Sequence, residues 1–203
     1  MSKTRALQLG AAALATAGVL SACSSGTNAG SIPPPASATG TPASSSQGGG
    51  EAPSVPSPLP TAALLANPCN GGLSADQVYK LGLAATGTKR QDQTGATCTW
   101  RSDTYDANQV SITAVTPNKN GLSDVYATRG NDKYFEPTTV SGYPAVYAGI
   151  LDRSGGDCSL WVGVTDQLAV NVQTQILDGP NKSNPCPVVE RVATAMVQHL
   201  QGS

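Results

Sequence analysis

Five cysteines and one histidine are the side chains best suited to covalent or metal chemistry in this chain of 203 residues. The first cysteine, Cys23, ends the motif Leu-Ser-Ala-Cys, which follows a basic start (Lys3, Arg5) and an apolar run over residues 6–20. This arrangement is typical of a bacterial lipoprotein signal, in which the cysteine thiol is the nucleophile that takes up a diacylglyceryl group. We therefore expect residues 1–22 to be a signal peptide and Cys23 to be the lipidated first residue of the exported protein.

Two other interpretations of the N-terminal segment stay open: an ordinary secretory signal cut near Ala22, and a retained anchor. The apolar run is about 15 residues long and is interrupted by Gln8, whereas a membrane-spanning helix needs about 20 residues. Two or more acyl chains hold a protein stably on a membrane. We expect a lipid-anchored protein on the extracytoplasmic face of the cell membrane, attached through the lipid on Cys23.

The remaining four cysteines form an even set, which is typical of an exported, disulfide-bonded domain. Four cysteines permit three pairings. We favour Cys69–Cys98 and Cys158–Cys186, because each of these pairs joins sequence neighbours and closes a loop of about 30 residues. In the chain-entropy model, each such loop stabilises the fold by about 3–4 kcal/mol.

Catalytic and metal chemistry have few candidates in this sequence. His199 is the only histidine, and it lies near the end of an amphipathic segment, away from any nucleophile motif. The segment from Asp152 to Asp157 holds two carboxylates and two glycines, but its spacing is not that of an EF-hand loop, so we interpret it as a turn. We expect no cofactor, no metal ion and no catalytic residue; an envelope hydrolase is the less favoured alternative.

The charge balance argues against nucleic acid as a partner. From Ala66 onward the chain has ten basic and twelve acidic residues, and its basic residues do not cluster beyond the pair Lys89 and Arg90. Nucleic-acid binding needs a concentrated basic surface, and so does electrostatic attraction to anionic lipids.

Composition divides the exported chain into two parts. Residues 23–65 are rich in Ser, Gly, Pro and Ala, which predicts a disordered linker without enough apolar side chains to form a core. Residues 66–203 have the length of one domain.

Two helices of this domain are strongly indicated. Ser74 and Gln77 have the spacing of a capping box at a helix start. Asn184 is the expected N-cap of a terminal helix, with Pro185 at its first position. Apolar side chains follow a helical stripe after it: Val189, Val192, Ala193, Met196 and Leu200.

Strands are predicted over residues 97–101, 109–115, 143–148, 158–164 and 167–173. The first is rich in β-branched and aromatic residues, 109–115 alternates strictly, and Pro144 indicates an edge or irregular strand. A short helix is expected over residues 122–129. The resulting order is α-β-β-α-β-β-β-α, and the short turns between neighbouring strands favour antiparallel pairing. The sequence thus predicts an α+β fold, a mostly antiparallel sheet with N-terminal and C-terminal helices packed on it and two disulfides.

An aromatic segment in the middle of the domain is the candidate binding surface. Tyr134, Phe135, Tyr143 and Tyr147 lie close together in the sequence, and exposed aromatic patches mark interaction sites. Half-buried core is the alternative interpretation. We expect a non-catalytic binding module whose partner is an envelope protein, with a glycolipid second; a carrier of a lipidic or small apolar ligand is the alternative.

Five motifs occur in a fixed order along the chain: the Cys23 signal, Asn67-Pro68-Cys69, Cys98-Thr99-Trp100, Asp157-Cys158-Ser159-Leu160 and Asn184-Pro185-Cys186. In this order the chain resembles a family of actinobacterial envelope lipoproteins that share a secreted domain of unknown function. The resemblance covers residues from Asn67 to the end and implies a secreted, lipid-anchored, disulfide-bonded α+β domain. It implies no catalytic residues.

Overall fold

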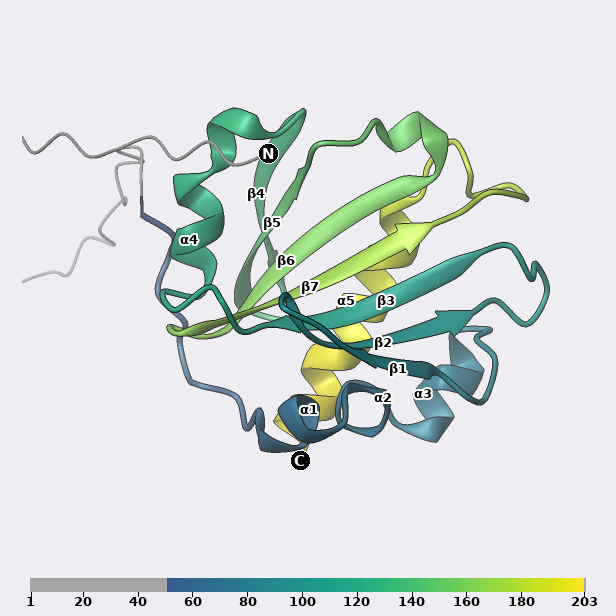
Figure 1. Ribbon diagram of the computed structural model, residues 1–203, viewed down its shortest axis with the longest axis horizontal. Coiled ribbons are helices and arrows are strands. Elements are labelled where there is room, and N and C mark those ends of the chain that lie inside the picture. The colour runs from purple at the N-terminus through teal and green to yellow at the C-terminus, as the bar shows by residue number, and fades with distance from the viewer. Residues whose placement is uncertain (1–50, 203) are drawn as a thin grey trace, which may run out of the picture. The chain divides into compact units, whose positions relative to one another are not determined.

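The domain is built on a seven-stranded antiparallel sheet, seen in a computed structural model that describes residues 51–202 (Figure 1). The strands are β1 (Thr88–Gln91), β2 (Gly95–Arg101), β3 (Gln109–Val115), β4 (Tyr134–Val140), β5 (Tyr143–Gly149), β6 (Asp157–Thr165) and β7 (Leu168–Gln175). Their order across the sheet is β1-β2-β3-β7-β6-β5-β4. The predicted signal peptide, Cys23 and most of the predicted linker lie outside the described residues.

Five α-helices and two short 3-10 helices accompany the sheet in this part of the chain. The α-helices are α1 (Ala62–Ala66), α2 (Pro68–Gly71), α3 (Ala75–Lys80), α4 (Leu122–Ala127) and α5 (Cys186–Gln201); the 3-10 helices are η1 (Arg129–Asn131) and η2 (Arg153–Gly155). None of the helices within residues 51–202 has the length and apolar content of a membrane span.

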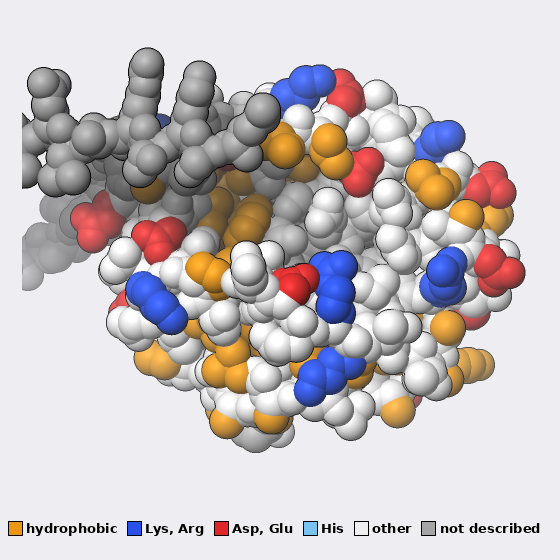
Figure 2. Space-filling view, viewed as in Figure 1, with side chains coloured by type: hydrophobic (Ala, Val, Ile, Leu, Met, Phe, Trp, Pro, Cys, Tyr) orange, Lys and Arg blue, Asp and Glu red, His pale blue; other side chains and the backbone are white. Residues whose placement is uncertain are grey.

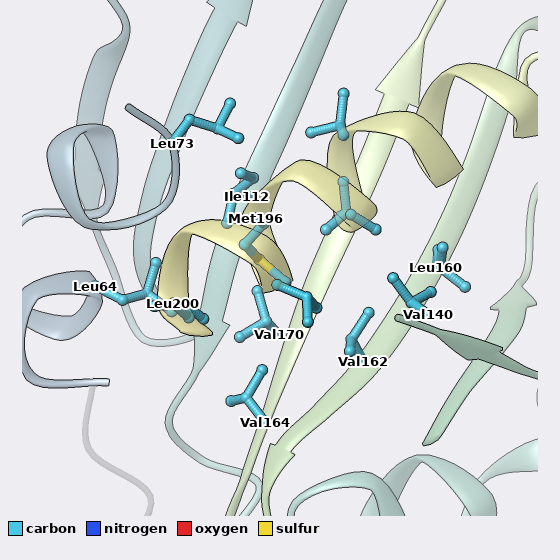
Figure 3. Packing of buried hydrophobic residues seen from close by; sticks show 14 of the residues in the cluster. Leu64, Leu73, Ile112, Val140, Leu160, Val162, Val164, Val170, Met196 and Leu200 are labelled. Carbon is cyan, nitrogen blue, oxygen red and sulfur yellow. The ribbon is translucent and has the colours of Figure 1, made fainter. Parts of the chain in front are cut away.

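The main core lies between one face of the sheet and α5. Alternate side chains of β3, β6 and β7 point to this face, and Ile112, Leu160 and Val170 are fully buried on it. Met196 and Leu200 of α5 pack against them, as Figure 3 shows. The amphipathic stripe predicted for the terminal helix is therefore the surface that closes the core.

Local sequence signals set the ends of the helices. Ser74 accepts a hydrogen bond from the backbone N–H of Gln77, and the Gln77 side chain accepts one from the backbone N–H of Ser74, so the predicted capping box is present. The start of α5 differs by one residue from the prediction. Pro185, rather than Asn184, is the N-cap, and no side chain caps this helix.

Both predicted disulfides are confirmed. Cys69–Cys98 joins α2 to β2 with a Cα–Cα distance of 5.0 Å, and Cys158–Cys186 joins β6 to the start of α5 with a Cα–Cα distance of 5.3 Å. Each bond therefore fastens a helix to the core face of the sheet.

The α+β class and the antiparallel sheet are also confirmed, and the sheet is wider than the sequence pattern indicates. β1 is an edge strand whose four residues are all exposed and polar, so no apolar alternation marks it. β4 begins at Tyr134 and contains Pro137, which an edge strand tolerates. The five-residue α1 and the four-residue α2 are too short to show a helical period.

The folded domain begins before residue 66, the predicted boundary. Leu59 and Leu64 are buried in the main core, with 6% and 0% of their surface exposed. The backbone N–H of Leu59 donates to the carbonyl of Val164, at 2.9 Å. Most of the segment 51–65 has linker-like composition, and its three leucines, of which Leu59 and Leu64 are buried, are its main signal of joining the fold.

Leu64→Ala is expected to lower the free energy of unfolding by about 2–3 kcal/mol, because it opens a cavity in a fully buried site. The neighbouring Leu65 is the matched control, since 39% of its surface is exposed and Leu65→Ala should change stability by less than about 0.5 kcal/mol. Urea unfolding of both variants tests this. Equal losses in the two variants would show that the boundary segment does not pack as described.

Candidate functional site

The face of the sheet opposite α5 carries polar side chains in three cross-strand rows, one residue each from β2, β3, β7 and β6. The first row is Thr97, Thr113, Asn171 and Trp161; the second is Thr99, Ser111, Gln173 and Ser159; the third is Arg101, Gln109, Gln175 and Asp157. We call these twelve residues the polar face. Because side chains alternate along each strand, the same alternation that builds the core places them together.

The polar face is hollowed. A groove of about 410 Å³ lies over its β2, β3 and β7 residues, and a second groove of about 470 Å³ continues from it toward α4 and the end of β5. The two grooves share Asp157, Trp161, Asn171 and Gln173 in their walls. Over β6, β7 and β3 the surface in Figure 2 is largely white, the colour of uncharged polar side chains and backbone. The grooves form one continuous concave region that is open to solvent.

A fork between β5 and β6 shapes the second groove. The β-ladder between these strands ends at the pair Tyr147 and Leu160, and beyond this pair the strands diverge (Figure 1). Aromatic side chains supply the hydrogen bonds that the ladder no longer makes. The Tyr134 hydroxyl accepts from the backbone N–H of Ser159 at 3.0 Å, and Trp161 Nε1 donates to the carbonyl of Ala148 at 3.2 Å. The fork therefore holds both aromatic rings in place.

A small second core supports the wall formed by α4. Leu122, Val125 and Tyr126 of α4 are buried against Val146 and Ala148 of β5. Trp161 packs against the edge of this cluster and is half-buried. The described members of this cluster that belong to a helix or strand lie on α4, β4, β5 and β6 and at Ala169 of β7, and none is on β2 or β3.

Some groups of the polar face are hydrogen-bonded to each other and others are available to a ligand. The hydroxyls of Thr97 and Thr113 lie 2.9 Å apart, and Asn171 Nδ2 donates to the Ser159 hydroxyl at 2.6 Å. Among residues 51–202, no side-chain hydrogen bond is formed by Gln173, which lies at the centre of the second row. Both residues line the grooves, but Asn171 is only 8% exposed, whereas Gln173 is half-buried, so the Gln173 amide is the more accessible donor and acceptor.

Three aspartates that line the second groove have shifted pKa values: burial raises the pKa of two of them, and hydrogen bonds lower the pKa of the third. Burial raises the pKa of Asp132 and of Asp157, both of which line the second groove. Asp132 Oδ2 is buried without a hydrogen-bond partner in the described part of the chain. The side chain and backbone of Asn120 donate to Asp124 and lower its pKa.

These shifts predict opposite effects of two Asp→Asn changes on the pH dependence of stability. The folded-state pKa of Asp157 is raised, so folding disfavours its ionised form and Asp157→Asn should raise the free energy of unfolding at pH 7. The folded-state pKa of Asp124 is lowered, so Asp124→Asn should lower stability at pH 7. Both differences should disappear as the pH falls below the carboxyl range, because the carboxyls are then protonated in both states. Urea unfolding from pH 7 to pH 2.5 checks this, and a gain for both variants or a loss for both would contradict the assignment.

The four aromatic residues predicted as a binding surface do not form one patch. Tyr143 is buried in the main core with 6% exposure, and Phe135 packs edge to face on Tyr126 with ring centroids 4.9 Å apart. Tyr134 and Tyr147 both lie against the Arg153 guanidinium, whose central carbon is 3.8 and 5.4 Å from their ring centroids. Alternation along β4 sends Phe135 to the second core, on the face opposite Tyr134. Tyr143 and Tyr147 point to the same face of β5 and differ in burial, since Tyr143 is inside the main core and Tyr147 only packs against it.

Tyr147 and Arg153 belong to a local network at the edge of the domain. Arg153 Nη1 donates to both carboxylate oxygens of Glu136, at 3.1 Å each. The Tyr147 hydroxyl donates to Glu190 of α5 at 3.2 Å, and burial together with the Glu190 charge raises the pKa of Tyr147 to about 12. This network fastens β4, β5 and α5 to each other, which is a structural role.

The other residues considered for chemistry lie elsewhere. His199 is on α5, where its Nε2 is 3.2 Å from the carbonyl of Asn70. Asp152 accepts hydrogen bonds from the backbone and hydroxyl of Ser154 and caps η2, so the segment is a turn. Within residues 51–202, no three His, Cys, Asp or Glu side chains are grouped so that they could hold a metal ion.

The polar face itself was not among the residues predicted from the sequence. Its signal is present in the same strands that indicated the core: nine of the twelve positions are Thr, Ser, Asn or Gln, and the other three are Trp161, Arg101 and Asp157. Alternation identifies these positions as outward-facing, but only the sheet order brings β2 next to β3 and β3 next to β7.

One family model matches the chain, over residues 18–199, and its description reads "Protein of unknown function (DUF3558)". No curated protein matches the chain, and no solved structure does.

Proposed function

Since the chain belongs to the DUF3558 family of proteins of unknown function, we propose that its folded domain is a non-catalytic binding module. The lipid on Cys23 anchors it to the extracytoplasmic face of the cell membrane, and the domain binds a component of the cell envelope in the groove over its polar face. The membrane anchor rests on the sequence alone, because Cys23 lies outside the described residues.

The observation that carries this proposal is the continuous groove on one face of the sheet. Ligand sites are concave and have a small number of directed polar groups. The two hollows, of about 410 and 470 Å³, share a wall that includes Trp161 and Asn171. The floor is a rigid sheet joined to α5 through the disulfide at Cys158, and rigid scaffolds position binding groups well.

The chemistry of the polar face supports binding more than turnover. A hydroxyl nucleophile needs a neighbouring base within hydrogen-bond reach. The Thr97 and Thr113 hydroxyls are bonded to each other, and the Ser159 hydroxyl is bonded to the amide of Asn171. These contacts orient the hydroxyls without activating them.

The open shape of the grooves also bears on the alternative of a lipid carrier. A carrier shields its apolar cargo in an enclosed cavity, whereas both hollows here are open to solvent. The most exposed apolar side chains of the lining lie at one rim, where Ile150 and Leu151 are 68% and 50% exposed; Val115, Val125 and Ala148 also line the hollows. The open groove therefore favours a module that binds an envelope component where that component lies, rather than a carrier that extracts a lipid from the membrane.

A blocking substitution tests the proposed function. Gln173→Trp places a large ring at the centre of the polar face, where the Gln173 side chain has no other partner, and it should reduce retention on washed envelope fragments by about tenfold or more. Gln198→Trp is the matched control, because Gln198 is exposed on α5, on the other side of the sheet. The assay is co-sedimentation of the chain from Ser24 onward, exported without lipid, with fragments used either intact or after protease treatment.

The proposal expects the unsubstituted chain and Gln198→Trp to sediment with the fragments and Gln173→Trp to stay in solution. Retention of both variants to the same extent would contradict it, and so would failure of the unsubstituted chain to sediment. Protease treatment separates an envelope protein from a non-protein partner, since only the first is lost.

A further inference from the structure

We infer that the ligand of the polar face is a neutral glycan, with a sugar ring on Trp161 and its hydroxyls on the amides and hydroxyls of the first two rows. This inference rests on the proposed function and names the class of ligand. Three observations carry it: the absence of charge in the first two rows, the mixture of donors and acceptors, and the fixed, half-buried indole.

The first two rows of the polar face carry no charged side chain: their eight residues are Thr97, Thr113, Asn171, Trp161, Thr99, Ser111, Gln173 and Ser159. Two cations border these rows: Arg101, in the third row after Thr99, and Arg90 of β1, opposite Thr97. Arg101 donates to the Asp106 carbonyl at 2.6 Å, and Arg90 is paired with Asp92 at 2.9 Å. Recognition of phosphate or carboxylate is typically made by Arg or Lys. An anionic ligand would therefore lose its hydration without gaining a counter-charge on these rows.

The polar groups of these rows both donate and accept hydrogen bonds. Gln173 offers an amide N–H and a carbonyl oxygen, and its neighbours on the adjoining strands are the hydroxyls of Ser111 on β3 and Ser159 on β6. Sugar hydroxyls also do both, so one ligand group can satisfy two neighbouring side chains. A protein partner would instead need an apolar centre to its interface, which these rows lack.

Trp161 supplies the apolar surface that a sugar ring requires. Its Nε1 donates to the Ala148 carbonyl, so the indole orientation is set before a ligand arrives. A ring held in this way loses little conformational freedom on binding. The indole faces the groove beside Asn171, its partner across the strands, which places an aromatic face next to amide donors and acceptors.

Two sources of a neutral glycan are possible, a free polysaccharide and the headgroup of a glycolipid. The exposed Ile150 and Leu151 line the second groove at the β5–β6 fork. Their apolar surface is suited to an alkyl chain attached to the sugar, and a free polysaccharide has no such chain to place there.

Tryptophan fluorescence tests the inference, because the two tryptophans of the chain differ in exposure. Trp100 is 1% exposed on the core side of the sheet, whereas Trp161 is half-buried at the groove. The chain from Ser24 onward, exported without lipid, is titrated with cellohexaose, maltohexaose and mannohexaose. Hexameric galacturonate and a neutral Ser-Gly peptide are the comparison probes.

At least one neutral hexasaccharide is expected to change the fluorescence of the chain, and the change should be absent in Trp161→Phe. Gln173→Ala keeps the fluorophore and should weaken the affinity by about tenfold. Tyr79→Ala is the control, since Tyr79 is 82% exposed on α3, away from the polar face, and it should bind as the unsubstituted chain does.

Octyl glucoside below its micelle concentration distinguishes the two sources. If the ligand is a glycolipid headgroup, octyl glucoside binds more tightly than methyl glucoside, and the double variant Ile150→Ser with Leu151→Ser loses this difference. If the ligand is a free glycan, the two glucosides bind equally. Response of Trp161 to the galacturonate or the peptide, with none to neutral sugars, would overturn the glycan inference. The proposed function would then still stand if the envelope co-sedimentation depended on Gln173.

Discussion

Replacing Cys158 and Cys186 together by Ala is expected to lower the free energy of unfolding by about 3–4 kcal/mol. The bond closes a loop with a sequence separation of 28, and the chain-entropy model assigns about this value to such a loop. It also fastens α5, the helix that closes the main core, to the central region of the sheet. Urea unfolding, followed by the fluorescence of the buried Trp100, measures the change.

Reduction of the native protein is the matched control for this effect. In reducing buffer the unsubstituted chain loses both disulfides. It should then unfold at about the same urea concentration as the variant that lacks Cys158 and Cys186, measured in the same buffer, in which Cys69–Cys98 is also reduced. An unchanged unfolding midpoint in the double variant would contradict the account of this bond as a main support of the core.

Cys23→Ala is expected to abolish metabolic labelling of the protein with fatty acid. The thiol is the atom to which the lipid is attached, so Ala at this position leaves no nucleophile. The protein should then be unprocessed or released from the membrane fraction. Cys69→Ala with Cys98→Ala is the control, because these cysteines belong to the folded domain and their loss should leave the labelling intact. Unchanged labelling of the Cys23→Ala protein would refute the lipoprotein interpretation.

The sequence predicted those parts of the fold that depend on local periodicity and on covalent pairing. The stripe of α5, the alternation in β3 and the capping box at Ser74 each report a buried face or a helix end within a few residues. The two disulfides followed from their short loops. The same reasoning did not find β1, because Thr88–Gln91 is polar on both faces.

The candidate site was harder to predict, because it depends on the order of strands across the sheet. Ser111 and Gln173 are 62 positions apart in the sequence and become direct neighbours only through the pairing of β3 with β7. The aromatic segment was predicted from sequence proximity instead; alternation along β4 sends Phe135 to the second core, and Tyr143 is buried in the main core. The divergence of β5 and β6 near Tyr134 and Trp161 leaves no local sequence pattern, because it depends on how the two strands are placed relative to each other.

The central claim is that a ligand occupies the polar face, and NMR of the side-chain N–H groups tests it most directly. Soluble carbohydrate released from protease-treated envelope fragments is added to the ¹⁵N-labelled chain from Ser24 onward, exported without lipid. We predict that the side-chain amides of Asn171 and Gln173 and the indole N–H of Trp161 shift, while the indole N–H of Trp100 does not. Shifts confined to residues outside the polar face, such as those around Tyr105 and Arg191, or no shifts at all, would contradict the claim.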